Sequence, residues 1–373
     1  MKVVCAPDSF KESMTAAHAA AAMAAGVRAA RPDAIVVEVP LSDGGEGFVA
    51  ALAAGLGADL RHLTVPDALG RPTRAAWALA GDLAVIEVAQ AVGLESIAPA
   101  ERDVRQATTV GVGELIGAAL DAGARRLVIG LGGSATNDGG AGLLHALGVR
   151  FRAADGTKLA PTPAALAHLT SVDTTGLDPR LAEVTLEAAC DVTHPLCGPD
   201  GASAVFGPQK GADAGDVAFL DGVLARVSAA LAPAEAHRPG AGAAGGLGWA
   251  LLALGATVRP GFDVVADAVG LDAALTDADL VLTGEGSVDA QTLAGKAPAG
   301  VARLAAAHGV PVVLFGGRLA PDAAALLGAG VHRLVCITPE GTALATALAR
   351  GPEHLAAAAA EVMSGIAGDA AQS

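Results

Sequence analysis

A glycine-rich stretch, VIGLGGSATNDGGAG (residues 128–142), offers the clearest chemistry in this chain of 373 residues. It follows a strand-like run, RRLVIG, so we expect a turn between a strand and a helix. Glycines at such a turn let several backbone N–H groups point at one anion, and hydroxyl side chains add donors. The predicted phosphate-binding residues are Gly132, Gly133, Ser134, Ala135, Thr136 and Asn137. The alternative is a tight turn in which glycine serves only to avoid steric clashes.

Known nucleotide-binding fingerprints do not fit this stretch or its neighbours. Gly130, Gly132 and Ala135 have the G-x-G-x-x-A spacing of a dinucleotide site. The acidic residue that such a site needs further on has only Asp155 as a candidate, and Asp155 lies in an expected Asp-Gly turn. A Walker A loop also fails, because Lys296 in AQTLAGKAP is followed by alanine and the first glycine is missing. A phosphate site here therefore belongs to neither class.

Charged loops follow the predicted strands at both ends of the chain. APDSFKES places Asp8, Ser9 and Lys11 after the first strand, as candidates for binding substrate or phosphate. SDGGEG places Asp43 after the second strand, and TGEGSVD places Glu285 after a later one. Open parallel sheets bind ligands at this edge, and carboxylates there suit Mg²⁺, although each loop alone could be merely solvated. The predicted metal ligands are Asp43, Asp138 and Glu285.

Two further candidates lie in the segment ACDVTHPLCGPDGASAVFGPQKGAD. Asp191 follows the apolar run LEAAC, which makes it a candidate general base at a strand end. Lys210 lies on a turn with a glycine on either side, a fitting place for a lysine that binds phosphate.

The elements that must position these residues alternate between strands and helices at both chain ends. KVVCAP and AIVVEVP read as buried strands, with a helix over TAAHAAAAMAAGVRAARPD between them and Thr15 as its N-cap. ADLVLTGEG, VPVVLFGG and VHRLVCITPE repeat the pattern near the C-terminus, with a helix expected at DAAALLGAG. The middle of the chain reads as antiparallel strands and a hairpin. We therefore predict an α/β fold in which a Rossmann-like parallel-sheet domain (residues 1–69 and 269–373) carries an inserted mixed α/β domain (residues 70–268).

The composition argues against several classes of protein. A net charge of −15 disfavours a nucleic-acid partner, because phosphate backbones require a basic face. No run of about eighteen apolar residues predicts a membrane span, and the N-terminus lacks the apolar core of a signal peptide. The four scattered cysteines are typical of reduced thiols in a cytoplasmic protein. The oligomeric state stays open, a homo-oligomer included.

Taken in chain order, six motifs resemble those of the glycerate kinase family, type I class. They are APDSFKES, SDGGEG, IGLGGSATNDGGAG, ACDVTHPLCGPDGASAVFGPQKGAD, PGAGAAGGLG and TGEGSVDAQTLAGKAP. The resemblance covers nearly the whole chain, from Met1 to about Gly351. The resemblance implies ATP-dependent phosphorylation of D-glycerate, with 2-phosphoglycerate favoured over 3-phosphoglycerate as the product. Similar sequences often read GEGRID where this one reads GEGSVD, so Lys296 or another cation is expected to replace that arginine.

The resemblance also suggests roles for the candidate residues. We expect Asp191 to orient or deprotonate the glycerate hydroxyl, and Lys11 and Lys210 to neutralise phosphate or carboxylate. Mg²⁺ is expected mainly on ATP oxygens, near the acidic turns. One alternative is a non-catalytic sensor of a small hydroxy acid, which release of ADP would exclude. A second is a nicotinamide-dependent dehydrogenase, which the failed fingerprints disfavour.

Overall fold

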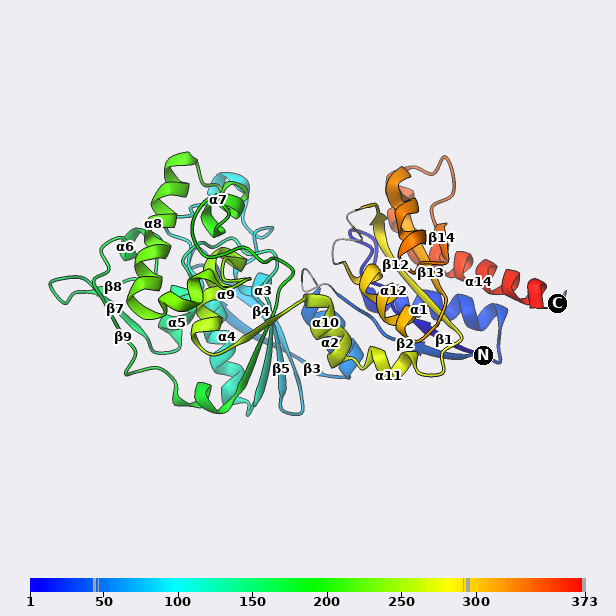
Figure 1. Cartoon of the computed structure of the whole chain (residues 1–373), viewed down its shortest axis with the longest axis horizontal. Coiled ribbons are helices and arrows are strands. Elements are labelled where there is room, and N and C mark those ends of the chain that lie inside the picture. The colour runs from blue at the N-terminus through cyan, green and yellow to red at the C-terminus, as the bar shows by residue number, and fades with distance from the viewer. Residues whose placement is uncertain (43–44, 46, 291, 293–295, 371–373) are drawn as a thin grey trace. The chain divides into compact units, whose positions relative to one another are not determined.

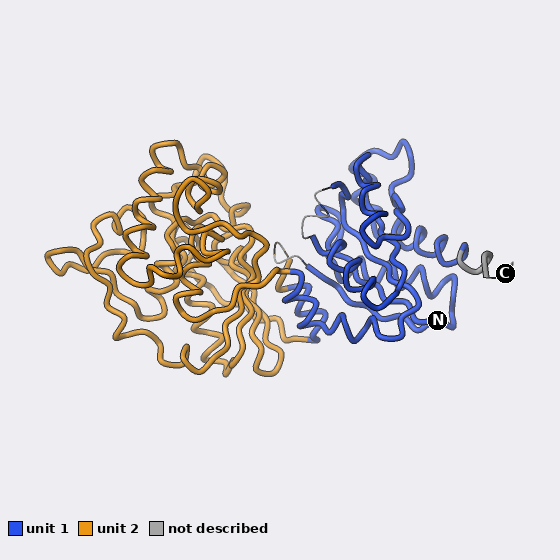
Figure 2. Tube along the Cα trace, in the orientation of Figure 1, with its two compact units in different colours: residues 1–43, 50–57, 262–373 blue, residues 44–49, 58–261 orange. Residues whose placement is uncertain are grey.

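The computed structural model describes residues 1–42, 45, 47–290, 292 and 296–370. The chain forms two compact units (Figures 1 and 2). Unit 1 consists of residues 1–43, 50–57 and 262–373, and unit 2 of residues 44–49 and 58–261. Each unit has its own sheet and core. Within the described residues, no helix is long and apolar enough to cross a membrane.

Unit 1 is built on a parallel sheet to which both ends of the chain contribute. Its strands are β1 (Lys2–Cys5), β2 (Ile35–Glu38), β12 (Leu280–Val288), β13 (Val312–Leu319) and β14 (Arg333–Cys336). They lie in the order β14-β13-β12-β1-β2, and every neighbouring pair is parallel. Counted in chain order within the unit this is 2-1-3-4-5, so the strand order reverses between β1 and β12. Ligands of open α/β sheets bind at the carboxyl ends of the strands beside such a reversal.

Unit 1 contains seven α-helices among its described residues, several of them rich in alanine. They are α1 (Ala16–Ala30), α2 (Phe48–Leu56), α10 (Gly261–Ala268), α11 (Leu271–Leu275), α12 (Ala297–Ala307), α13 (Leu344–Ala349) and α14 (Gly351–Ala370). Thr15 caps α1 by accepting the N–H of His18, as predicted. Small side chains let α1 and α14 approach closely, and Met23 and Leu355 share one buried cluster with the sheet.

Unit 2 contains a mixed sheet in the order β11-β10-β6-β5-β4-β3 and a small antiparallel sheet in the order β8-β7-β9. The strands of the mixed sheet are β3 (Asp59–Pro66), β4 (Pro72–Ala80), β5 (Leu83–Glu87), β6 (Arg126–Gly130), β10 (Thr185–Ala189) and β11 (Thr257–Arg259). The small sheet is made of β7 (Arg150–Arg152), β8 (Lys158–Leu159) and β9 (Ser171–Asp173). Strands β5, β6, β10 and β11 run parallel, so their carboxyl ends share one edge.

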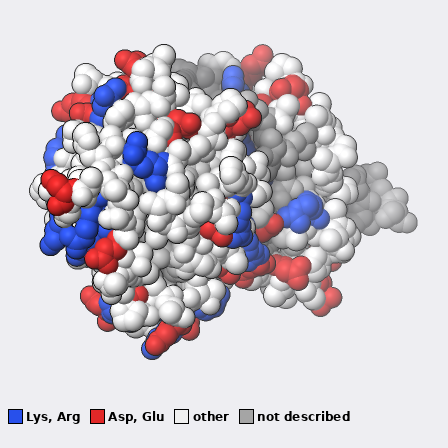
Figure 3. Space-filling model, turned by 60° about the vertical axis from the view of Figure 1, so that its left-hand side comes forward, with Lys and Arg blue, Asp and Glu red and all other residues white. Residues whose placement is uncertain are grey.

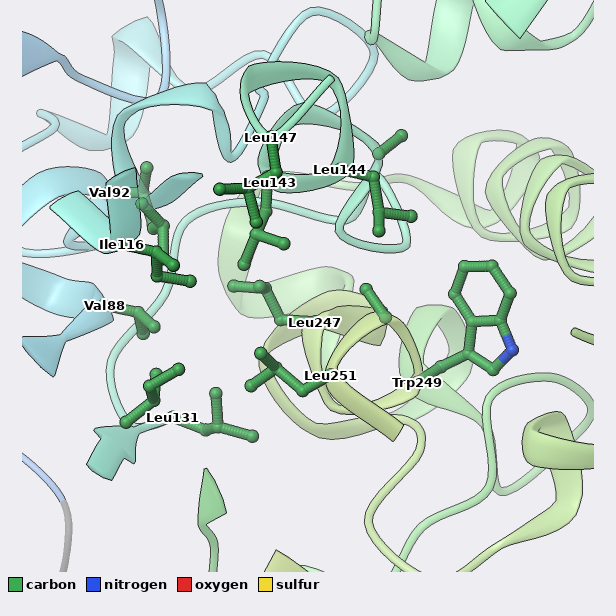
Figure 4. Packing of buried hydrophobic residues seen from close by; sticks show 14 of the residues in the cluster. Val88, Val92, Ile116, Leu131, Leu143, Leu144, Leu147, Leu247, Trp249 and Leu251 are labelled. Atoms are coloured by element: carbon green, nitrogen blue, oxygen red, sulfur yellow. The ribbon is translucent and has the colours of Figure 1, made fainter. Parts of the chain in front are cut away.

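The helices of unit 2 pack on this sheet around one apolar cluster. They are α3 (Val88–Val92), α4 (Val110–Asp121), α5 (Ala141–Ala146), α6 (Pro163–Leu166), α7 (Ala202–Phe206), α8 (Ala214–Leu231) and α9 (Ala243–Ala253). In Figure 4, Leu143 of α5 points towards Leu247 and Leu251 of α9, and all three are buried. The Trp249 indole, also buried, donates to the Ala232 carbonyl at 2.9 Å. The core thus fixes α5, the helix that begins at the end of the glycine stretch.

The α/β fold with a parallel sheet made by both chain ends is confirmed, with differences in detail. Residues 58–69 lie in unit 2 because β3 pairs with β4, and residues 262–268 lie in unit 1 within α10. The segment Pro321–Ala329 is a 3₁₀ helix rather than the expected α-helix. Strand β12 runs on through the GEG sequence, because Glu285 and Ser287 pair with β13. Glu285 therefore lies within a strand and not in a turn after it.

Candidate active site

Within the glycine stretch, residues 131–140 form the loop between β6 and α5, called the glycine loop below. Leu94 donates its N–H to the Gly133 carbonyl at 2.8 Å, and Ala135 donates to the Val92 carbonyl at 2.8 Å, which holds the loop against the end of α3. Gly133 is exposed and has a φ of 69°, a left-handed conformation that favours glycine. The N–H of Ala135 is therefore occupied within the protein, which removes it from the predicted phosphate donors.

The N–H groups at the start of the loop are in a different situation. Within the described part of the chain, the N–H groups of Gly132, Gly133 and Ser134 have no hydrogen-bond acceptor. Gly132 is half-buried, Gly133 is exposed and Ser134 is buried, so the donors extend from the surface of the loop inwards. Adjacent free N–H groups on a tight turn form a concave donor surface for an anion. The predicted anion-binding role of these N–H groups stays a prediction.

Lys210 reaches the same loop from the 3₁₀ turn Pro208–Lys210. Its side chain is only 3% exposed, and Nζ donates to Ser134 Oγ at 3.1 Å and to the Thr136 carbonyl at 2.7 Å. Burial lowers the pKa of Lys210 to about 7, and the nearby Asp138 carboxylate opposes this shift. Near neutral pH, the ammonium is thus poised between its charged and neutral forms.

Asp138, predicted as a metal ligand, is fully buried in the interior of unit 2. One oxygen accepts from the Thr109 N–H at 2.8 Å and from the Thr109 hydroxyl at 2.9 Å, as well as from the Gly142 N–H at 3.0 Å. The other oxygen accepts from the Gly140 N–H at 3.0 Å. Burial raises the pKa of Asp138, and these hydrogen bonds work against that rise. The carboxylate holds the glycine loop to α4 and α5, so it does not fit the part of a metal ligand.

Two more side chains of the loop carry buried oxygens that are unpaired. Asn137 donates to Ser203 Oγ at 2.9 Å. Its own Oδ1 and the Thr136 hydroxyl have no hydrogen-bond partner among the described residues, although both side chains are fully buried. Buried polar atoms are nearly always paired, so these oxygens mark a place where a ligand or solvent donor can act.

The carboxyl edge of the same sheet brings acidic side chains to either side of the loop. Gly130 at the end of β6 pairs with Glu87 of β5 on one side and with Ala189 of β10 on the other. Asp191 lies two residues beyond Ala189, is exposed, and accepts the Gly261 N–H through Oδ1 at 2.8 Å. The predicted general base and the glycine loop therefore lie at one edge of one sheet.

Glu87 is a buried carboxylate at the same sheet edge that the sequence analysis did not single out. It is buried at the end of β5, where it accepts the N–H of Val49 at 3.2 Å and the N–H of Gly47 at 3.4 Å. A carboxylate at these N–H groups caps the start of α2. The sequence contains one signal for Glu87, because this charged residue ends the apolar run LAVIE. The run does not indicate that the carboxylate accepts the N–H of Gly47, 40 residues earlier.

In unit 1, the first charged loop lies at the reversal of strand order. Asp8 donates its N–H to the Gly284 carbonyl of β12 at 2.9 Å and accepts the Ser9 N–H through Oδ1 at 2.6 Å. Lys11 is exposed, and its backbone passes close to Gly286, where an added Cβ would lie 3.1 Å from the Lys11 nitrogen. The predicted cluster of Asp8, Ser9 and Lys11 is therefore placed where open parallel sheets bind ligands.

The end of β12 carries the second group of unit 1. Glu285 is buried, accepts the Thr292 hydroxyl at 2.6 Å and forms an ion pair with Lys296 at 2.9 Å. Because Lys296 neutralises Glu285, neither is well suited to its predicted role as phosphate or metal ligand. The cation beside Ser287 is Arg318, which lies opposite in the β12–β13 register and donates to Ser287 Oγ at 3.4 Å.

The predicted metal ligands do not come together as a site. Asp43 lies outside the described residues, and the oxygens of Asp138 and Glu285 are engaged as above. Across residues 1–42, 45, 47–290, 292 and 296–370, no group of three His, Cys, Asp or Glu side chains could hold a metal ion. Lys and Arg side chains are mixed with Asp and Glu over the face drawn in Figure 3. On this face, the picture shows no large area of basic side chains alone among the described residues (Figure 3).

Comparison with known proteins identifies the family. The model of the glycerate kinase family matches residues 3–367. The chain belongs to this family. A glycerate kinase of Bacillus subtilis (strain 168) is 45% identical over 373 residues, which cover 98% of each chain. A glycerate 2-kinase of Escherichia coli (strain K12) is 45% identical over 329 residues, which cover 86% of each chain.

A solved structure shares the fold of this glycerate kinase family member. The crystal structure of putative glycerate kinase 2 from Salmonella typhimurium LT2 matches it with a TM-score of 0.90 and 43% identity, over 99% of each chain. The predicted family and enzyme class, a glycerate kinase, are thereby confirmed. The roles of the individual residues stay predictions.

Proposed function

We propose that this protein transfers the terminal phosphoryl group of ATP to the 2-hydroxyl group of D-glycerate, forming 2-phosphoglycerate. The observation that carries the proposal is the loop at the end of β6, where free N–H groups of Gly132, Gly133 and Ser134 adjoin the buried ammonium of Lys210. Family membership supports the reaction class, and the name of the Escherichia coli relative supports the 2-position.

The chemistry follows from what phosphoryl transfer needs. The transition state spreads negative charge over the transferred group, and the protein contributes by positioning and electrostatic stabilisation. We assign phosphate binding to the N–H groups of the loop and charge neutralisation to Lys210. An anion beside Nζ favours the protonated lysine, so binding of phosphate raises the pKa of Lys210 above 7 and draws in a proton.

Asp191 is assigned to the acceptor hydroxyl. It projects from the same sheet edge as the loop, with one carboxylate oxygen tied to the Gly261 N–H. This hydrogen bond holds one carboxylate oxygen in place, and we assign the carboxylate to orienting the glycerate hydroxyl or taking its proton. In unit 1, we assign anion binding to Lys11 and Arg318, at the carboxyl edge of the sheet.

Mg²⁺ enters this proposal as part of the nucleotide. The predicted protein ligands that are described do not fit a metal centre, because Asp138 is saturated by internal hydrogen bonds and Glu285 is paired with Lys296. ATP would therefore bring Mg²⁺ on its own phosphate oxygens. A cytoplasmic location accords with ATP as donor and with the free state of the four cysteines.

A coupled assay of ADP release tests the proposal. With D-glycerate, ATP and Mg²⁺ we expect turnover that L-glycerate does not support at a comparable rate and that excess chelator abolishes. Binding of D-glycerate without ADP release would contradict the enzyme and favour the hydroxy-acid sensor. Undiminished turnover in chelator would refute only the role of Mg²⁺ and would leave the kinase activity standing.

A further inference from the structure

Arg102 has unusual partners for an arginine. Its guanidinium donates to backbone carbonyls, to Gln209 at 2.8 Å and to Leu94 and Ile97 at 3.4 Å each, and within the described residues it takes part in no ion pair. The carboxylates that flank it in sequence are engaged elsewhere. Glu101 pairs with Arg71, and Asp103 accepts backbone N–H groups of the following turn.

These carbonyls belong to the segments that hold the candidate active site. Gln209 is the residue before Lys210 in the 3₁₀ turn. Leu94 donates its N–H to the Gly133 carbonyl of the glycine loop, so one peptide segment contacts both the guanidinium and the loop. Arg102 thus connects the segment around Leu94, which holds the glycine loop, to the turn that carries Lys210.

The fit of Arg102 against the lysine turn is close. Gly211, which follows Lys210, has a φ of 98°, and an added Cβ there would lie 3.1 Å from the Cβ of Arg102. The turn is closed by hydrogen bonds from Lys210 to Gly207 at 2.9 Å and from Gly211 to Pro208 at 3.1 Å. Because this turn is short, a movement of the Gln209 carbonyl changes the direction of the Lys210 side chain.

We propose that Arg102 is a positioning residue that holds the Lys210 ammonium against the glycine loop. It does not touch substrate in this proposal; it acts through the carbonyls of Gln209 and Leu94. The inference rests on the proposed function of Lys210 as the phosphate-binding cation. Arginine suits the position because its planar fork presents donors in several fixed directions, whereas lysine is a compact charge on a flexible stem.

Chemical labelling of lysine tests this positioning directly. The chain has five lysines, so mass spectrometry can follow each one during acetylation by an N-hydroxysuccinimide ester. In the wild-type protein the buried Lys210 should react slowly and the exposed Lys158 quickly. Arg102→Met loses the hydrogen bonds from the charged guanidinium, which are stronger than bonds between neutral groups. The rate of Lys210 labelling relative to Lys158 should therefore rise by about tenfold or more.

Turnover supplies the second readout. Arg102→Met should lower kcat by about tenfold or more. Added ethylguanidinium should restore part of the kcat of this variant. The kcat of Arg102→Lys should lie between those of Arg102→Met and the wild type. Arg125→Met is the matched control, because Arg125 is an exposed arginine of the same unit whose partner is Glu183; it should change neither readout.

The outcomes separate this inference from the proposed function. If folded Arg102→Met labels Lys210 at the wild-type rate, Arg102 does not position the lysine and the inference is overturned. If Arg102→Met fails to fold, the same labelling comparison on Arg102→Lys decides, with wild-type protection of Lys210 again overturning it. Labelling needs no turnover, so absence of glycerate phosphorylation in the wild type would contradict the proposed function without touching this result.

Discussion

Replacing Lys210 with methionine should change how the stability of this protein depends on pH. Burial lowers the pKa of Lys210 from 10.5 to about 7 in the folded protein. In the unfolded chain the lysine keeps its proton up to about pH 10. Between these values the unfolded state binds more protons than the folded state, so the wild-type protein gains stability as pH rises from 7 towards 10. Methionine has no proton to lose, and Lys210→Met lacks this gain.

The magnitude follows from the two pKa values. The full difference corresponds to about 5 kcal/mol of destabilisation, present at low pH and relieved as pH approaches 10.5. Between pH 7 and pH 9 the wild type should gain about 2 kcal/mol relative to Lys210→Met. Other titrating groups are shared by both proteins and largely cancel in the difference.

Urea unfolding of both proteins at pH 7 and pH 9 measures this difference. Lys158→Met is the matched control for the loss of a lysine, because Lys158 is an exposed lysine of the same unit. A Lys210→Met difference that stays constant within about 0.5 kcal/mol across this range would show that Lys210 titrates normally, and would refute the argument that burial poises it near neutral pH.

Three other substitutions test the remaining site residues. Asp191→Asn should lower kcat by ~10²–10⁴-fold with little change in either KM, because the amide cannot take a proton; a stable variant within a few-fold of wild type would move this role elsewhere. Gly133→Val places a β-branched residue at a φ of 69°, at a cost of about 1–2 kcal/mol, and should abolish turnover while circular dichroism stays native; normal kinetics would make the loop a purely steric turn. Arg318→Gln should raise the KM of an anionic substrate by about tenfold with kcat nearly unchanged, and an unchanged KM would remove Arg318, the neighbour of Ser287, from the site.

Local sequence signals predicted the parts of the fold that local physics controls. Short apolar runs at both chain ends gave the parallel strands, and Thr15 before an alanine-rich run gave the start of α1. The glycines around Lys210 correctly indicated a turn. The residues at strand ends were placed at sheet edges, as for Asp8 and Asp191, because parallel strands bring their carboxyl ends together.

The roles of several candidate residues depend on contacts with residues that are distant in the sequence, and the sequence alone did not predict these contacts. In SATNDGG, Asp138 has the appearance of a metal ligand. In the structure one of its carboxylate oxygens accepts two hydrogen bonds from Thr109, which is 29 residues away in sequence. Glu285 looks like a turn carboxylate, but strand pairing with β13 and the ion pair to Lys296 occupy it. Arg102 carries no motif, and only its contacts with carbonyls from separate segments reveal it.

The phosphorus NMR spectrum of the product tests the central claim most directly. After incubation with ATP, Mg²⁺ and D-glycerate, we predict a new phosphomonoester resonance that the single proton on C2 splits into a doublet, as 2-phosphoglycerate requires. A triplet, from the two methylene protons of a 3-phosphate, would contradict the proposed position of transfer. A spectrum with no new phosphomonoester, from folded protein under the same conditions, would contradict the phosphorylation of glycerate itself.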